Sequence, residues 1–515
     1  MPGHSAEKIF PSGRFVLLIT VLVIFAFSNH PGFSQKKTQV KIVNARELRI
    51  DNKVGENIKQ LVGDVVMRQD STWFYCDSAL LNSQSNNFDA FGNVRINVND
   101  TLNIYGDVLN YDGATRLAIM HYNVKMVDKR AVLTTDHLNY DRNTGIAFYN
   151  TGGRIVSDTN ILTSRIGYFY SNENLFFFRD SVVLTNPDYI MRSDTLKYHT
   201  VTETAFFLGP TTITGEENFI YCERGWYDTK NNISSLKQNA YIVHGDQTVE
   251  GDSIYYNRGR SYGEAYRNII ITDTVEDIII NGNYAEFDRD EGYAFVTDSA
   301  LAIMIDKYDS LFLHADTIMV MSDSSGKAEV INAYHKVKFF RPDLQGMSDS
   351  MTYFVPDSTV TLRGNPILWS DENQLSADTI KIVYANNEVD SMVMYNSCFI
   401  ISRDDSTTFN QIKGKTMVGY FKENRIYKIT VSGNSETIYF VREEDRTLIG
   451  INKALASRML IFLDGNEIST ISYIDKPDAH LVPEKDYPPA ELKLKGFQWI
   501  EEQRPLDRYD IFKWD

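Results

Sequence analysis

Residues 107–111 read Asp-Val-Leu-Asn-Tyr, and the pattern of an acid, an apolar residue two later and an aromatic residue four later recurs about every 29 residues. The clearest other copies begin at Asp136, Asp194 and Asp252, and weaker copies begin at Asp77, Arg165, Glu223, Asn283, Asp316, Asp349, Asp378 and Lys415. Such regular spacing is typical of one structural unit stacked many times. The chain is therefore expected to form one long body, whose function is spread along a surface.

A second marker follows each acid by roughly 16 residues, as a turn and then alternating apolar residues. Examples are Gly92-Asn93-Val94-Arg95-Ile96, Asn123-Val124-Lys125-Met126, Asn239-Ala240-Tyr241-Ile242, Asn268-Ile269-Ile270-Ile271 and Gly364-Asn365-Pro366-Ile367. The period of two, together with abundant β-branched and aromatic residues, predicts two strands per unit and an all-β fold. Only Lys453–Phe462 and Pro489–Glu502 show a weak helical pattern.

The acid and the residues two and four later are expected to share one face of a strand that starts at the acid. Stacked units would join the later positions into two apolar rows, which include Leu109, Tyr111, Leu138, Tyr140, Leu196, Tyr198, Ile254, Tyr256, Ile318 and Ile380. The acid is expected to accept hydrogen bonds from turn amides. The rows either fill a closed core or line an open trough for acyl chains, and the pattern leaves both alternatives open.

The N-terminus has the features of a cleavable secretory signal. Lys8 and Arg14 precede an apolar run over residues 15–27, and the predicted cleavage site follows Ser34. We therefore predict a signal peptide over residues 1–34, and no later stretch is apolar for long enough to form a membrane helix. Residues 35–445 hold the repeats, in one body or in two stacked sections that meet near 300–345. Residues 446–515 are expected to form a cap and a Pro-rich charged tail.

Composition and motifs exclude several classes of function. With 52 basic and 68 acidic residues the net charge is −16, which argues against a nucleic-acid partner. Cys76 and Cys222 lie five units apart and cannot pair in an ordered stack, so these cysteines and Cys398 are expected to be buried apolar side chains. No catalytic or metal-ligand spacing is present; residues 288–292 resemble a calcium loop but lack its ligand pattern. The sequence thus predicts neither an enzyme nor a cofactor or metal site.

Units such as Gly106-Asp107-Val108-Leu109-Asn110-Tyr111-Asp112, alternating with Gly92-Asn93-Val94-Arg95-Ile96, resemble the OstA-like family (organic solvent tolerance, LptA-like) of periplasmic lipopolysaccharide-transport proteins in Gram-negative bacteria. The alternation covers roughly residues 40–440 and is similar to the long form in Bacteroidetes. The resemblance implies an elongated β-jellyroll, or β-taco, of two facing sheets with about 13 units of about 29 residues. It also implies that acyl chains of lipopolysaccharide or another outer-membrane lipid lie inside, in the periplasm or at the outer membrane.

The resemblance further implies partners of the same fold, joined by pairing of edge strands. The first strands, near residues 40–66, are expected to pair with such a partner upstream. The chain departs from the family in its length and in lacking the alternating segments of a terminal membrane barrel. Two other functions stay open: a structural or adhesive solenoid with a closed core, and a carbohydrate-active β-helix enzyme.

Overall fold

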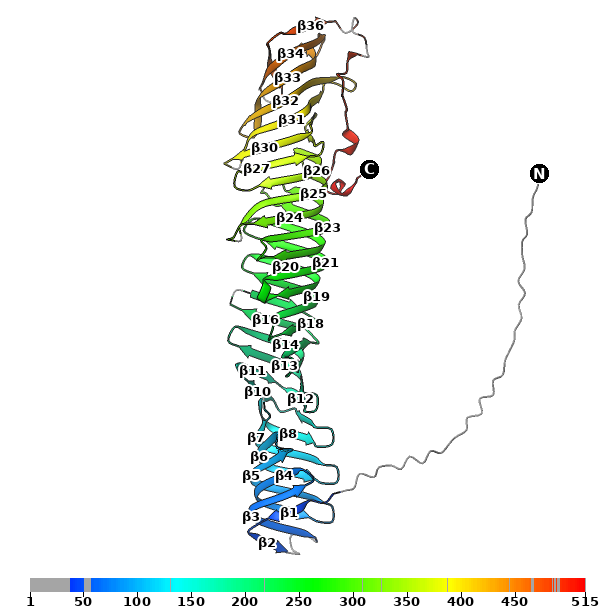
Figure 1. The fold of residues 1–515 in the computed structure, drawn as a ribbon. Helices are drawn as coiled ribbons and strands as arrows, with labels where there is room; N and C mark the ends of the chain where they lie inside the picture. The colour runs from blue at the N-terminus through cyan, green and yellow to red at the C-terminus, as the bar shows by residue number, and fades with distance from the viewer. Residues whose placement is uncertain are drawn as a thin grey trace, which may run out of the picture.

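The computed structural model describes residues 38–50, 57–129, 131–216, 218–307, 309–325, 327–386, 388–443, 445–464, 467–483, 485, 488 and 491–514. These residues form a long column of antiparallel strands, with β1 and β2 at one end and β35 and β36 at the other (Figure 1). The all-β prediction is confirmed. The predicted signal peptide lies outside the described residues.

Twenty strands run the full width of the column. They are β3 (Ile58–Gln69), β4 (Thr72–Asn82), β5 (Asn87–Val98), β6 (Leu102–Asp112), β7 (Leu117–Val127), β8 (Val132–Asp141), β13 (Leu175–Asn186), β14 (Tyr189–His199), β19 (Ile233–His244), β20 (Gln247–Asn257), β21 (Tyr262–Asp273), β22 (Ile278–Asp288), β23 (Tyr293–Met304), β24 (Leu311–Ser322), β25 (Ala328–Arg341), β26 (Leu344–Phe354), β31 (Glu388–Arg403), β32 (Phe409–Lys422), β33 (Arg425–Arg442) and β34 (Leu448–Asp464).

At eight levels the same path is split into two short strands that pair with opposite halves of a neighbouring long strand or short pair. These pairs are β1 (Lys41–Asn44) with β2 (Glu47–Ile50), β9 (Ile146–Tyr149) with β10 (Gly153–Ser157), β11 (Asn160–Ser164) with β12 (Ile166–Tyr170), β15 (Thr204–Phe207) with β16 (Thr211–Gly215), β17 (Asn218–Cys222) with β18 (Arg224–Asp228), β27 (Thr359–Arg363) with β28 (Ile367–Ser370), β29 (Asn373–Ser376) with β30 (Thr379–Ala385), and β35 (Glu467–Ile474) with β36 (Asp478–Val482). Short 3-10 helices are η1 (Arg258–Arg260), η4 (Glu501–Gln503) and η5 (Asp510–Phe512).

Each long strand bends in its middle, so that its two halves belong to two facing walls. In β6, Ile104 and Gly106 face inward, Asp107 is exposed, and Leu109 and Tyr111 face inward again. Opposite this bend the register of β5 shifts between Phe91 and Val94, so two residues are left over as a bulge. We call the half with Ile104 wall A and the half with Leu109 wall B. The bends form the closed corner of the jellyroll, and the hairpins that link the strands form its two rims.

The two sequence markers meet at this corner. The Asn123 side-chain amide donates to the Asp107 carboxylate at 2.7 Å, and three further Asn–acid pairs 16 residues apart repeat the contact at 2.7–3.1 Å. Asn123 has a left-handed φ of 49°, which Asn tolerates better than most residues. The predicted placement of the acid was therefore wrong: it lies at a bend in mid-strand, faces outward, and bonds a side-chain amide.

The predicted apolar rows are confirmed by the strand register. On wall B the position-four residues alternate with the residues between them in the order Tyr111, Ala118, Tyr140, Ala147, Phe169, Phe176, Tyr198, Ala205, Tyr227, Ser234, Tyr256, Gly263, Phe287 and Ala294, each paired with the next. The position-two residues form a parallel row nearer the corner. Both rows face the space between the walls.

The C-terminal region differs from its prediction. Residues 453–462 lie in β34 rather than in a helix, and of residues 491–502 only Glu491, Glu501 and Glu502 have 3-10 helical conformation, the last two in η4. Residues 491–514 run back along the outside of the column beside β34 to β24 (Figure 1). They cover the outer face of wall A, where Leu494, Phe497 and Trp499 pack on Phe399, Ile401, Ile438, Phe440 and Ile451. Strand pairing continues through residues 300–345 and on to β36; the proposed division into domains stays a prediction.

Candidate functional site

A trough of about 3190 Å³ lies between the two walls. Its lining begins at Thr185, at the end of β13, and continues to Ile471 in β35. At ~4.8 Å per strand, the roughly 17 steps from β14 to β35 give a length of about 80 Å. A separate and much smaller cavity of about 180 Å³ lies near Val40 and Ile42, at the β1 end. The trough is therefore far larger than this second cavity.

Wall A presents an apolar ladder to the trough. Consecutive strands contribute directly paired residues in the order Ile213, Ile220, Ile242, Val249, Ile271, Ile280, Ala302, Leu313, Phe339, Gly346, Leu368, Leu375, Ile400 and Ile412. The sequence analysis did not predict this ladder as part of a site. The second marker could have indicated it, because Ile242 and Ile271 are the last apolar residues of two copies of that marker.

Wall B lines the same space with large and small residues in alternation. Tyr256, Gly263, Phe287 and Ala294 are directly paired in that order, and all four line the trough. A Cβ on Gly263 would lie 2.2 Å from the Phe287 ring, so only glycine permits this ring to lie flat against the wall. Phe287 is 39% exposed although it faces inward, because it borders the open trough.

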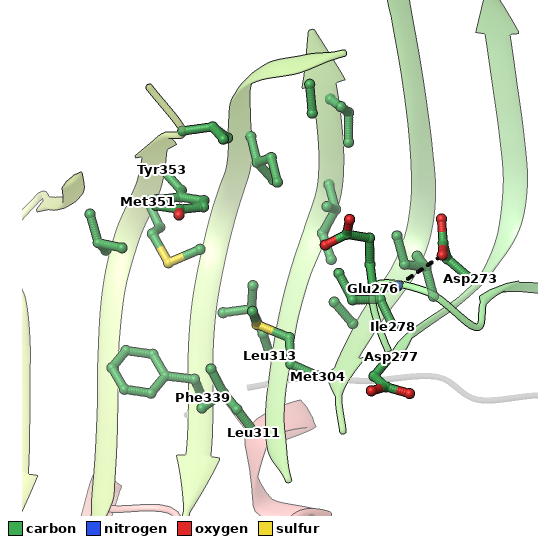
Figure 2. Close-up of a pocket in the computed structure, with 18 of the residues that line it drawn as sticks. Asp273, Glu276, Asp277, Ile278, Met304, Leu311, Leu313, Phe339, Met351 and Tyr353 are labelled. Carbon is green, nitrogen blue, oxygen red and sulfur yellow. Dashed lines mark hydrogen bonds between the residues drawn. The ribbon is translucent and has the colours of Figure 1, made fainter. Parts of the chain in front are cut away.

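Polar hairpins form the rim on the wall A side. Figure 2 shows Asp273, Glu276 and Asp277 on the turn between β21 and β22, beside the apolar side chain of Ile278. The Asp273 carboxylate accepts hydrogen bonds from the Gln247 side chain at 2.9 Å and the Glu276 amide at 3.0 Å. These bonds lower the pKa of Asp273. The trough thus has an apolar floor and a charged rim.

Apart from the small cavity at the β1 end, packed side chains occupy the space between the walls before Thr185. The Phe74 ring from wall A lies 4.6 Å from Tyr111 and 5.1 Å from Phe88, both on wall B. Along the same wall B row, Tyr111, Tyr140 and Phe169 are 2%, 4% and 3% exposed. The alternative of a closed core therefore holds for the first third of the column, whereas an open trough holds for the rest.

An aromatic contact marks the boundary between the two sections. The rings of Tyr189 on wall A and Tyr227 on wall B lie 5.9 Å apart, and both residues line the end of the trough. Burial raises the pKa of both phenols, that of Tyr189 further through the nearby Tyr227. Both hydroxyl groups therefore stay neutral at physiological pH.

The structure divides the predicted row residues into two groups. Ile254, Tyr256 and Ile318 line the trough. Leu109, Tyr111, Leu138 and Tyr140 lie in the closed section, and Leu196, Tyr198 and Ile380 lie on the rows without lining the trough. Sequence periodicity found the rows, but it did not distinguish the filled part from the open part.

The described residues contain no group of three or more His, Cys, Asp or Glu side chains placed to hold a metal ion. Within the same residues, no helix has the length and apolar character needed to cross a bilayer. Cys76, Cys222 and Cys398 are buried and unpaired, as expected. Asp288 accepts hydrogen bonds from the amides of Asp290 and Glu291, which makes residues 288–292 a simple hairpin turn.

Comparisons with known proteins agree with this architecture. Residues 37–194 match the model of the OstA-like protein family, and residues 306–388 match the model of the LptA/(LptD N-terminal domain) LPS transport proteins. Residues 37–194 are thus similar to OstA-like proteins and span the closed section, whereas the second match lies in the section with the trough. No curated protein matches the sequence.

Among solved structures, the chain is similar to LptH from Pseudomonas aeruginosa, the LptA homologous periplasmic component of a lipopolysaccharide transport device. The sequences are 16% identical, the match covers 22% of this chain and 82% of LptH, and the TM-score is 0.20.

Proposed function

We propose that this protein is a non-enzymatic carrier of lipopolysaccharide, which holds the acyl chains in its trough during transport through the periplasm to the outer membrane. The trough itself carries the proposal: it is long, it is walled by paired aliphatic and aromatic residues, and its rims are polar. The matches of residues 37–194 to OstA-like proteins and of residues 306–388 to lipopolysaccharide-transport proteins support the choice of cargo.

Transfer free energies account for the retention of such a cargo. Each methylene group removed from water contributes about 0.8 kcal/mol, so roughly ten buried methylenes contribute ~8 kcal/mol before the entropy of association is subtracted. A sugar head group would lose hydration inside an apolar floor. It would instead lie at the rim, beside hairpins such as the one with Asp273 and Glu276.

The carrier would act with partners of the same fold. The outer edges of β1 and β2 are exposed and belong to the first strands of the column, and β35 and β36 form the last level. Main-chain groups at such edges are free to pair with a strand of another chain. We propose that transport proteins with related jellyrolls join the column in this way.

Two adjacent tyrosines provide a sharp test of lipid binding. Tyr256 lines the trough, whereas Tyr255 faces outward from the same strand. Each is replaced in cells by p-benzoylphenylalanine, the cells are irradiated, and the purified protein is probed for lipopolysaccharide adducts. We expect adducts for Tyr256→p-benzoylphenylalanine and none for the Tyr255 variant. Equal adducts from both, or none from Tyr256 in a well-expressed protein, would refute the carrier function.

A further inference from the structure

We propose that the trough has a closed end, so that acyl chains stop at the Tyr189–Tyr227 contact. The section before this contact, which we call the stalk, has a packed interior, and a cluster of polar side chains, which we call the clasp, holds its two rims together. This inference rests on the proposed function for the identity of the cargo, but the closure of the stalk stands on the geometry alone. It predicts that lipid enters and leaves between the two rims of the trough or at the β35 end of the column, and that lipid does not pass along the interior to β1.

The clasp consists of Gln69, Asp70, Tyr111, Arg116 and Arg142. Gln69 and Asp70 lie at a hairpin of wall A, and the two arginines lie at hairpins of wall B. The Gln69 amide donates to the Gly113 carbonyl at 2.9 Å, and the Arg116 guanidinium lies 2.9 Å from the Asp70 carboxylate. These contacts bridge the two rims, so the gap between the rims is closed at this level of the column.

Arg142 is the centre of the clasp. Its guanidinium donates to the Gln69 side-chain oxygen at 2.9 Å, to the Gln69 carbonyl at 3.1 Å and to the Tyr111 hydroxyl at 2.5 Å. The side chain is only 7% exposed. Nε of this guanidinium is buried without a partner among the described residues, so the buried charge depends on the acceptors that its two terminal nitrogens reach. Two of these acceptors belong to Gln69 on the opposite rim, so separation of the rims would leave the charge poorly compensated.

Side-chain volume closes the stalk from within. Phe74 and Met67 on wall A face Phe88 and Tyr111 on wall B, and all four are at most 2% exposed. Wall B alternates large and small residues in both sections, whereas wall A of the trough offers Ile271, Ile280 and Ala302 in place of Phe74 and Met67. Less volume therefore lies between the walls there, and the space stays open.

The Tyr189–Tyr227 contact is the stop at the end of the trough. Met191, the residue on wall A next inward from Tyr189, is 1% exposed, and Leu184, its partner in β13, is 5% exposed. The wall A side chains next to the tyrosine pair are thus already buried. An acyl chain that extended past this pair would have to displace packed side chains, which a filled core opposes.

Closure is tested without lipid by thiol labelling. Ala118 in the stalk and Ala294 in the trough occupy equivalent places on the wall B row, and the three native cysteines are buried. The full chain with Ala118→Cys or Ala294→Cys is treated with a maleimide, and the unchanged chain gives the background. We expect Ala294→Cys to be labelled at least about tenfold faster than Ala118→Cys, because only an exposed thiolate reacts. Similar rates would overturn the closed stalk.

The clasp is tested in the same background. Adding Arg142→Met to the Ala118→Cys chain removes all donors of the guanidinium but keeps much of the side-chain volume. We expect labelling of that thiol to accelerate severalfold, whereas Arg142→Met should leave the rate of Ala294→Cys unchanged. An unchanged rate for Ala118→Cys would mean that the clasp does not hold the rims together.

A photoreactive lipid separates this inference from the proposed function. The unchanged chain is irradiated with diazirine-bearing palmitic acid, and the crosslinked peptides are mapped by mass spectrometry. Crosslinks confined to residues 185–471 support both proposals, and crosslinks to the inner residues between 67 and 178 overturn the stop. Crosslinks nowhere overturn the lipid function, while slow labelling of Ala118→Cys would still support a closed stalk.

Discussion

Two phenylalanines on the same wall B row should respond differently to truncation. Phe169, in the stalk, is 3% exposed and its ring lies 4.4 Å from Phe176. Phe287, in the trough, is 39% exposed. Phe169→Ala would leave a cavity in a filled core, which costs ~3–5 kcal/mol. Phe287→Ala loses only the buried part of the ring, roughly 60% of the 1.5–3 kcal/mol for full burial, or ~1–2 kcal/mol, because the adjacent space is already open.

The measurement must be local, because a stack of repeats can open section by section. Hydrogen exchange, followed by mass spectrometry over a range of urea concentrations, gives the opening free energy of the strands on either side of each residue. We expect the loss at Phe169→Ala to exceed the loss at Phe287→Ala by at least about 1 kcal/mol. Equal losses would refute the reasoning, since they would place Phe287 in a packed core.

Three further changes follow from single contacts. Asn123→Ala should destabilise the corner by ~1–3 kcal/mol, because it removes the hydrogen bond to Asp107 and puts alanine at a left-handed φ. Asn123→Gly should destabilise it less, because glycine adopts this φ freely, and thermal unfolding of the two variants measures the difference. Burial raises the pKa of Tyr149 to about 12, so the neutral phenol favours the folded state. This contribution to stability is complete below pH ~10 and is lost between pH ~10 and about 12. In urea unfolding measured against pH, Tyr149→Phe should therefore lose less stability at alkaline pH than the unchanged chain. Gln411→Ala removes hydrogen bonds of 2.8 Å to Leu492 and Leu494, so limited proteolysis should release the C-terminal segment faster; an unchanged rate would mean that this segment is held elsewhere.

The C-terminal segment illustrates what sequence patterns missed. Gln345, Gln374 and Gln411 are buried on the outer face of wall A, and each bonds this segment. Nothing in a local pattern distinguishes a strand glutamine that faces solvent from one that binds a distant segment. The helical prediction for residues 453–462 fails for a related reason. Their apolar residues fit both the helical and the strand period, and only pairing with β33 makes the segment a strand.

The sequence predicted part of the candidate site. The position-four row was predicted correctly, and its member Tyr256 lines the trough. Its members Tyr111 and Tyr140 have the same sequence signature but lie in the closed section. The difference depends on wall A, where Phe74 fills the space that Ile271 leaves open. Residues of the two walls that face each other have no fixed separation in sequence, so a repeat pattern cannot report their combined volume.

The sequence by itself determined the all-β fold, two strands in each unit of about 29 residues, and the rows that face inward, because strand period, turn residues and stacking are local or regularly repeated properties. Only the tertiary structure decided where the walls meet and where they separate. That decision depends on contacts across the interior, such as Arg142 with Gln69 and Tyr189 with Tyr227. These contacts join residues through space, and their energy arises only when both walls are in place.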